Sequence, residues 1–171
     1  LYRNHPSIIF WSIANESVWN KDFEYAAKAM AALDPTRPLT FNYFPWGWVE
    51  NQQEDETVCA IGSDHYPSPS GPAKYSDFHR PINFGEFVHL NAYNRYELAT
   101  DVALRDLWGT YLHKMWENMY LSQGVVGGSI WAGIDDTFYW DYPLEDGTIE
   151  ERTVGYGTWG PIDGWRRKKP E

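Results

Sequence analysis

The sequence predicts an α/β fold in which strands and helices alternate along the chain. The first observation is an uncharged, mostly apolar run from Ser7 to Ala14, which indicates a strand buried on both faces of a parallel sheet. The second is a segment of helical periodicity, from about Asn20 to Leu33, that follows this strand directly. The third is the return of short apolar runs, each ending in polar residues, through the rest of the chain. This alternation is typical of βαβ units.

Each element has its own local signal. Asn20 can cap the first helix, and prolines at 35 and 38 end it because proline cannot continue a helix. A second long helix is expected over residues 96–121, and Gly124 stops it. Further strands are expected at 39–43, 57–63, 81–84 and 125–131, with a helical turn at 75–79. The last forty residues are expected to be rich in loops, with a hairpin or turn at 145–148.

Composition excludes several classes of function. Fourteen basic and 24 acidic residues give a net charge of -10, which disfavours nonspecific binding to nucleic acid or to an anionic membrane. Cys59 is the single cysteine, so we expect a buried thiol, and no Cys/His cluster has the spacing of a zinc site. The aromatic content is 18%, with 10 Trp and 12 Tyr, which suits a pocket that stacks on sugar rings as well as a core.

Candidate functional side chains follow the predicted strands. The carboxyl ends of parallel strands meet at one edge of the sheet, where α/β folds keep their chemistry. Two glutamates, Glu16 and Glu86, lie at such ends. Without other information, Glu16 is equally well explained as part of a polar turn. For Glu86 the less favoured alternative is a helix-start carboxylate that interacts with the helix dipole. Other polar or aromatic residues near strand ends are Asn15, His65, Tyr66, His89, Trp131, Asp135 and Asp136.

The start of the chain resembles a known motif. Residues 3–7, Arg-Asn-His-Pro-Ser, followed by the apolar strand and then Asn15-Glu16-Ser17, resemble the acid/base motif of family 2 glycoside hydrolases. These are the β-galactosidase and β-glucuronidase relatives. The resemblance implies that Glu16 is the general acid/base and that Asn15 binds the sugar hydroxyl next to the anomeric carbon.

Three later segments continue the resemblance. Residues 81–87, Pro-Ile-Asn-Phe-Gly-Glu-Phe, resemble the nucleophile strand, which implies that Glu86 is the nucleophile and that His89 helps to hold the sugar. His65-Tyr66 resembles the segment whose tyrosine hydroxyl bonds the nucleophile carboxylate. Residues 127–131, Gly-Gly-Ser-Ile-Trp, resemble the last barrel strand, whose tryptophan (here Trp131) forms a wall of the sugar site. A half-buried packing aromatic is the alternative for the His65-Tyr66 pair.

The sequence also departs from the family. β-Galactosidases commonly continue after the last barrel strand with a second Trp and an Asp-Gln, whereas residues 132–136 here are Ala-Gly-Ile-Asp-Asp. The Asn-x-Lys triplet with which β-glucuronidases read the uronate is missing from the sequence. Residues 155–170 resemble the closing segment of the family, and the four basic residues at 166–169 are compatible with solvated charge or with an anionic sugar.

The resemblance favours a partial (β/α)8 TIM barrel, in which residues 1–171 are the C-terminal portion of the catalytic domain and supply about the last five of eight strands. An open doubly wound sheet is the structural alternative. The chain begins without an initiator Met, almost directly in a strand, so an N-terminal barrel half and β-sandwich domains are expected upstream. The sequence does not indicate the cellular compartment, and it is compatible with a periplasmic or extracellular location.

The resemblance implies a retaining exo-β-glycosidase, β-galactosidase-like, that acts on a carbohydrate without an organic cofactor. It also implies that any magnesium ion near the acid/base is held by residues upstream of this sequence. A β-glucuronide or β-mannoside substrate, or a noncatalytic carbohydrate-binding barrel, are the alternatives. We expect the carboxyl groups of Glu16 and Glu86 to lie about 5–5.5 Å apart, as retention requires. We also expect Tyr66 to contact Glu86, and Trp131 to line the same cleft.

Overall fold

The computed structural model describes residues 2–43, 54–89 and 97–169. They form two compact units, each of which is treated by itself. The first unit comprises Leu1–Phe87 and Lys114–Ser129, and the second comprises Val88–His113 and Ile130–Glu171. Among the described residues, none of the helices combines the length and the apolarity that crossing a membrane requires.

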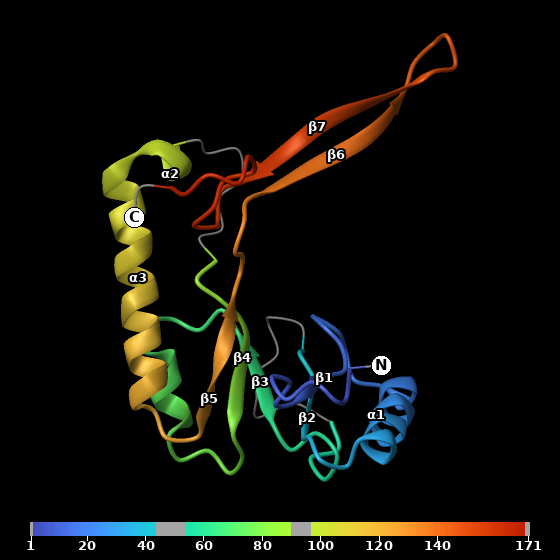
Figure 1. The fold of residues 1–171 in the computed structure, drawn as a ribbon, viewed down its shortest axis with the longest axis vertical. Coiled ribbons are helices and arrows are strands. Elements are labelled where there is room, and N and C mark those ends of the chain that lie inside the picture. Colours follow the sequence, from blue (N-terminus) through green and yellow to red (C-terminus); the bar gives the residue numbers. More distant parts are fainter. Residues whose placement is uncertain (1, 44–53, 90–96, 170–171) are drawn as a thin grey trace. The chain divides into compact units, whose positions relative to one another are not determined.

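The strands of the first unit follow one another in chain order (Figure 1). β1 (Trp11–Ser12) pairs in parallel with β2 (Leu39–Thr40), and β3 (Gly62–His65) pairs in parallel with β4 (Ile82–Phe87). A parallel bridge between Thr40 and Ile61 connects β2 to the start of β3, and β5 (Val125–Ile130) is hydrogen-bonded to β4. This order is the one expected of consecutive strands in a parallel α/β sheet. The described residues do not form a closed barrel.

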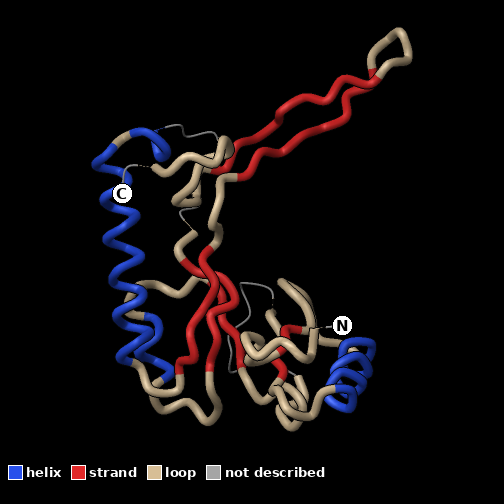
Figure 2. Tube along the Cα trace, in the orientation of Figure 1, coloured by secondary structure: helices blue, strands red, loops and turns tan. Residues whose placement is uncertain are grey.

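The predicted first strand is much shorter than expected. Only Trp11 and Ser12 are in β1, and the preceding residues are turns or loop, drawn tan in Figure 2. The prediction of burial on both faces is wrong, because Ile9 is 66% exposed and Ser12 is also exposed. β1 pairs only with β2 among the described residues, so its other edge receives no strand there.

The first helix is as predicted. α1 spans Lys21–Leu33, and the side chain of Asn20 accepts hydrogen bonds from the backbone N–H groups of Asp22 (2.9 Å) and Phe23 (3.2 Å). Helical spacing predicts one buried stripe on this helix, of Phe23, Ala26, Ala27, Met30 and Leu33, and the prediction is wrong at Leu33, which is 69% exposed. Ala27 belongs to a core of four buried residues, against which Phe23 and Met30 pack: Ala27, Leu39, Phe41 and Cys59.

Phe41 is the centre of this core. Its ring is fully buried and makes edge contacts with three aromatic rings at centroid distances of 4.8–5.0 Å: Trp19, Phe23 and Tyr43. Edge-to-face packing is a favoured geometry because the positive ring edge meets the negative ring face. Cys59 is buried, as predicted, and burial raises the pKa of its thiol to about 12.

Other boundaries differ from the predicted ones. β3 begins at Gly62 rather than at residue 57, and β4 extends through Phe87, so that Glu86 lies inside the strand instead of after it. A 3-10 helix spans Gly71–Tyr75 in place of the turn expected at 75–79. The long helix is split into α2 (Glu97–Thr100) and α3 (Val102–Leu121). Residues 44–48, which follow the predicted strand at 39–43 and are expected to begin a loop, lie outside the described residues, as does residue 96, where the second long helix is expected to begin.

The second unit contains a long hairpin where mainly loops were expected. β6 (Asp136–Pro143) pairs antiparallel with β7 (Ile149–Gly157), and the turn lies at the predicted residues 145–148. Gly147 has a φ of 82°, a left-handed conformation that suits glycine, and Asp146 accepts a 2.9 Å hydrogen bond from the N–H of Thr148. The length of the hairpin was not predicted because the residues on either side of the turn mix aromatic and charged types without strict alternation.

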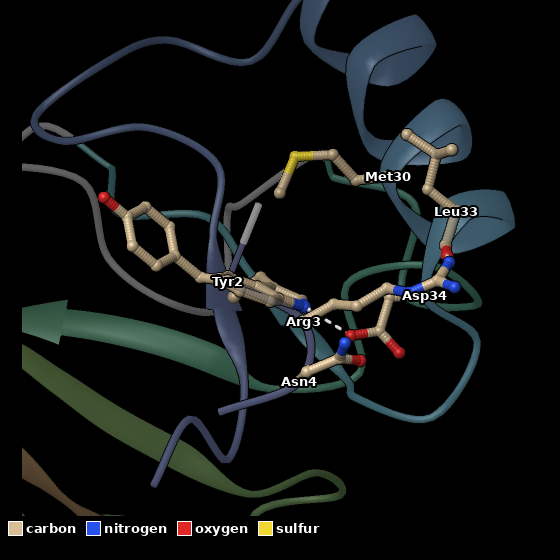
Figure 3. Close-up of a pocket in the computed structure, with 7 residues that line it drawn as sticks. Tyr2, Arg3, Asn4, Met30, Leu33 and Asp34 are labelled. Atoms are coloured by element: carbon tan, nitrogen blue, oxygen red, sulfur yellow. Dashed lines mark hydrogen bonds between the residues drawn. The ribbon is translucent and has the colours of Figure 1, made fainter. Parts of the chain in front are cut away.

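Asp34 ties the end of α1 to β1. Its carboxylate accepts hydrogen bonds from the Thr36 hydroxyl and N–H, the Trp11 indole (3.0 Å) and the Arg37 guanidinium (2.7 Å). These donors, led by the Thr36 hydroxyl, hold the pKa of Asp34 far below its usual 3.8. Asp34 also lines a cavity of about 520 Å³ (Figure 3). None of the predicted site residues lines this cavity, whose lining residues are Tyr2, Arg3, Asn4, Trp11, Met30, Leu33 and Asp34.

We therefore predict that Asp34→Asn lowers the free energy of unfolding at neutral pH. We also predict that this free energy falls less in the variant than in the parent as the pH is lowered. A carboxylate with a depressed folded-state pKa contributes stability that is fully present above about 3.8 and is lost as pH falls through the folded-state pKa. Urea unfolding should show a lower midpoint for the variant at pH 7 and a smaller difference from the parent at pH 2–3. Asp77→Asn, at an exposed position, is the control and should unfold like the parent at both pH values.

Candidate active site

A bulge in β4 sets the position of Glu86. Asp64 of β3 pairs with Phe84, but the next residue, His65, pairs with Glu86, so Gly85 is an extra residue in β4. Such a bulge interrupts the alternation of side chains and redirects the next one. A Cβ at Gly85 would lie 2.2 Å from His65 Nε2 and 2.8 Å from Asn42 Oδ1, distances that only glycine permits. The bulge therefore places Glu86 beside His65.

Two donors hold the Glu86 carboxylate. Asn15 Nδ2 donates to Oε1 at 3.1 Å, and the Tyr66 hydroxyl donates a short hydrogen bond to Oε2. The backbone N–H of Tyr66 also donates to the carbonyl of Glu86 at 2.9 Å. Glu86 is only 7% exposed, so its orientation is fixed by partners from the β1 and β3 ends. The expected contact between Tyr66 and Glu86 is present.

Glu16 also lies close to His65. Its Oε1 lies 3.7 Å from His65 Nδ1, and its side chain is 33% exposed, whereas that of His65 is 1% exposed. One carboxylate oxygen of Glu16, one ring nitrogen of His65 and one carboxylate oxygen of Glu86 all lie within 4.8 Å of one another. The two glutamates, 70 positions apart in sequence, thus form one cluster, as predicted.

The backbone is strained at both ends of this cluster. Glu16 has a φ of 43° and Tyr66 a φ of 50°, in the left-handed region that costs a non-glycine residue about 1–2 kcal/mol. Strain of this kind persists where surrounding contacts enforce it, and it is concentrated at functional sites. Here the hydrogen bonds of Asn15 and Tyr66 to Glu86 are the contacts that enforce it.

Asn42 is a supporting residue that sequence reasoning missed. Its Oδ1 accepts from the Ser63 hydroxyl, its Nδ2 donates to Ser12 Oγ at 3.2 Å, and its backbone bonds the carbonyl of Ala14 and the N–H of Ser17. Asn42 is 8% exposed, and these hydrogen bonds connect it to residues in or next to β1 and β3. An amide side chain near the carboxyl end of the strand predicted at 39–43 was the available signal.

The other predicted residues lie in the second unit. His89 makes an edge contact with Trp159 at a centroid distance of 4.7 Å, and Trp131 lies 6.4 Å from the same ring. The second unit therefore brings His89 and Trp131 around one buried tryptophan, which is 2% exposed. That they share a cleft with the carboxylates stays a prediction.

Asp135, a further candidate, has a structural role. It is 5% exposed and accepts hydrogen bonds from the Tyr156 hydroxyl (2.6 Å), the Gly160 N–H (2.9 Å) and Lys169 Nζ. Burial, with the adjacent Asp135 carboxylate, raises the pKa of Tyr156 well above its usual value. Lys169, expected among solvated charges, is buried in this ion pair with its side chain 2% exposed.

The cluster lies in the part of the chain that matches a known family. The model of the TIM barrel domain of glycosyl hydrolases family 2 matches residues 1–128, which include Glu16, His65 and Glu86. The chain belongs to glycosyl hydrolase family 2. The predicted family and the glycoside hydrolase class are thereby confirmed, and the doubly wound alternative is set aside in favour of the barrel domain.

Curated relatives of this family 2 chain are named β-galactosidases. The one from Enterobacter cloacae is 27% identical over 144 residues, which cover 78% of this chain and 12% of the relative. The one from Vibrio cholerae is 25% identical over 171 residues, which cover 88% of this chain and 15% of the relative. The chain thus spans about an eighth of the length of these relatives.

Solved structures share the fold. A β-D-glucuronidase of Dictyoglomus thermophilum has a TM-score of 0.63 at 19% identity, covering 98% of this chain and 31% of that one. A β-galacturonidase of Eisenbergiella tayi, bound to galacturonate, has a TM-score of 0.64 at 18% identity, with coverages of 98% and 32%. At this identity the similarity concerns the fold.

We predict that Gly85→Ala destabilises the family 2 chain by about 1–3 kcal/mol, because the added methyl group overlaps the His65 ring and Asn42. Gly109→Ala is the matched control, since Gly109 lies in α3 with open space around its Cβ position. That control should stabilise by about 0.5–1 kcal/mol. Chemical denaturation of both variants measures the difference, and equal stabilities would contradict the packing described at Gly85.

Proposed function

We propose that this chain carries the two catalytic carboxyl groups of a retaining exo-β-glycosidase of the β-galactosidase type. The observation that supports the proposal most directly is that a carboxylate oxygen of Glu16 and one of Glu86 lie within 4.8 Å of each other. Retaining enzymes place their carboxyl groups about 5–5.5 Å apart, whereas inverting enzymes need a wider gap for a water molecule.

The environments of the two glutamates support different roles. Glu86 accepts hydrogen bonds on both oxygens, which suits an ionised carboxylate that acts as the nucleophile. Glu16 is one-third exposed at the mouth of the cluster, where it can reach a leaving group and then a water molecule. We assign Glu86 as nucleophile and Glu16 as general acid/base.

In the proposed reaction, a Glu86 oxygen attacks the anomeric carbon while Glu16 gives its proton to the departing glycosidic oxygen. A glycosyl-enzyme ester results, and the aglycone leaves. Glu16, now ionised, takes a proton from a water molecule that attacks the same carbon, and Glu86 is released as a carboxylate. The sugar product keeps the β configuration because two inversions have occurred.

The remaining assignments complete the proposal. Asn15, His65, Tyr66, His89 and Trp131 are proposed to contact the sugar or to hold the nucleophile. This chain is proposed to supply about the last five barrel strands, with the first three and the accessory β-sandwich domains elsewhere in the full-length protein. No organic cofactor takes part, and a magnesium ion, where present, is held by residues outside this chain.

A β-uronide is the second candidate substrate. Two of the solved structures that share the fold are named as a β-glucuronidase and a β-galacturonidase, whereas the curated relatives are named β-galactosidases. A panel of aryl β-galactoside, β-glucuronide, β-galacturonide and β-mannoside, offered to the full-length protein, separates these candidates. Binding without turnover of any of them would favour the noncatalytic carbohydrate-binding alternative.

We predict that Glu86→Gln in the full-length protein lowers turnover by roughly a thousandfold or more while the fold is retained. The amide is nearly isosteric with the carboxylate but is a poor nucleophile. Glu117→Gln, at an exposed position of α3, is the control and should leave turnover unchanged. Turnover of the Glu86 variant within a few-fold of the parent would remove Glu86 from the nucleophile role.

For Glu16→Ala we predict a loss that depends on the leaving group. Substrates with poor leaving groups need protonation most and should slow by about 10²–10⁴-fold, whereas activated aryl glycosides still form the glycosyl-enzyme. Azide should then speed the breakdown of that intermediate and give a β-glycosyl azide. A uniform loss on all substrates, with no effect of azide, would contradict the role of Glu16.

A further inference from the structure

His65 has a buried imidazole that lacks hydrogen-bond partners. The side chain is 1% exposed, and neither ring nitrogen has a hydrogen-bond partner within residues 2–43, 54–89 and 97–169. Burying a nitrogen that can donate or accept is costly unless a partner compensates. The glycosidase reaction as proposed uses both neighbouring carboxylates but gives this imidazole no proton to carry.

The nearest polar atoms to His65 are carboxylate oxygens. Glu16 Oε1 lies 3.7 Å from Nδ1, and an oxygen of Glu86 completes a triangle whose corners all lie within 4.8 Å of one another. Asn15 and Tyr66 fix the Glu86 carboxylate, and the strand pairing of His65 with Glu86 fixes the ring beside it. Two of the three corners are thus preorganised.

We propose that Glu16, His65 and Glu86 form a binding site for a first-row transition-metal cation of the Zn²⁺ type, which occupies the catalytic cluster in place of substrate. One imidazole nitrogen and two carboxylate oxygens are a common ligand set for Zn²⁺, with further positions for water. Magnesium prefers an all-oxygen octahedron, so the imidazole selects against it. This site is separate from any magnesium site upstream of Glu16.

The ligand atoms need only a small adjustment. Ligands about 2.1 Å from a tetrahedral zinc ion lie roughly 3.4 Å from one another. The Glu16 Oε1–His65 Nδ1 distance of 3.7 Å is already close to this value. The ligand atoms lie no more than 4.8 Å from one another, so closing any side of the triangle requires at most about 1.4 Å, and Glu16 can supply the movement because its side chain is one-third exposed. The bound cation would neutralise the two carboxylates and block both proposed roles. Only this inhibitory part rests on the proposed function.

Calorimetric titration of the metal-free protein with ZnCl2 tests the site directly. The parent should bind one zinc ion through this cluster, and His65→Gln, Glu16→Gln and Glu86→Gln should each weaken that binding at least tenfold. His79→Gln is the matched control, because His79 and Glu56 form an exposed histidine–carboxylate pair (2.9 Å) away from the cluster. MgCl2 at the same concentration should give no binding at the cluster. Circular dichroism verifies that each variant is folded, and His65→Asn replaces His65→Gln if the latter unfolds.

The outcomes separate this inference from the proposed function. Zinc binding that His65→Gln leaves unchanged, or an absence of zinc binding, overturns the site whether or not the protein is a glycosidase. Zinc binding that depends on all three residues supports the site even if no glycoside is hydrolysed. Where hydrolysis is observed, Zn²⁺ should inhibit competitively with the glycoside, and noncompetitive inhibition would contradict occupation of the catalytic cluster.

Discussion

The extra residue at Gly85 is the constraint on which the carboxylate cluster depends. In a regular parallel ladder His65 would pair with Gly85, and the next side chain of β4 would be directed to the opposite face. The bulge shifts the pairing so that Glu86 pairs with His65. Glycine is required because the imidazole occupies the space where any Cβ would lie. One residue thus decides which face of the sheet the proposed nucleophile occupies.

The cluster also depends on the abrupt change from apolar to polar packing along β2 and the residues after it. Phe41 is the centre of an aromatic core, and Asn42, the next residue, lies among polar groups of three strand ends. Dense packing around Phe41 limits the movement of the backbone on which Asn42 lies. Rigid support of this kind is what reacting groups need to stay within a fraction of an ångström of their working positions.

The sequence predicted the elements whose signals are local. The cap at Asn20 and the turn at 145–148 depend on neighbouring residues, and both were located correctly. The bulge could not be predicted, because a register shift between strands depends on packing between residues 20 positions apart. The acidic residues at 50–56 predict a solvated loop or short helix, yet Glu54 is buried with Arg80 in an ion pair. A buried pair of this kind has no sequence signal until the fold brings the two residues together.

Family resemblance supplied what local signals could not, and it did so unevenly. It brought together Tyr66 and Glu86, whose contact the structure contains, because the chemistry of a nucleophile requires a fixed donor at that place. It gave no role to Asn42, which acts through backbone and side-chain bonds to three strand ends. Motifs identify groups that react, whereas the groups that hold them are identified only by their contacts.

The division of the chain clarifies why the sugar is harder to predict than the reaction. Glu16 and Glu86, together with Asn15 and Tyr66, lie in the first unit, so their mutual geometry is set by packing inside that unit. The second unit begins at Val88, directly after the nucleophile strand, and it contains the remaining proposed sugar contacts, His89 and Trp131. The proposed reaction therefore depends on the first unit, whereas the proposed recognition of the sugar depends in part on the second. The names of the similar proteins differ in the same respect, since the curated relatives are named β-galactosidases and the solved structures are named for uronides.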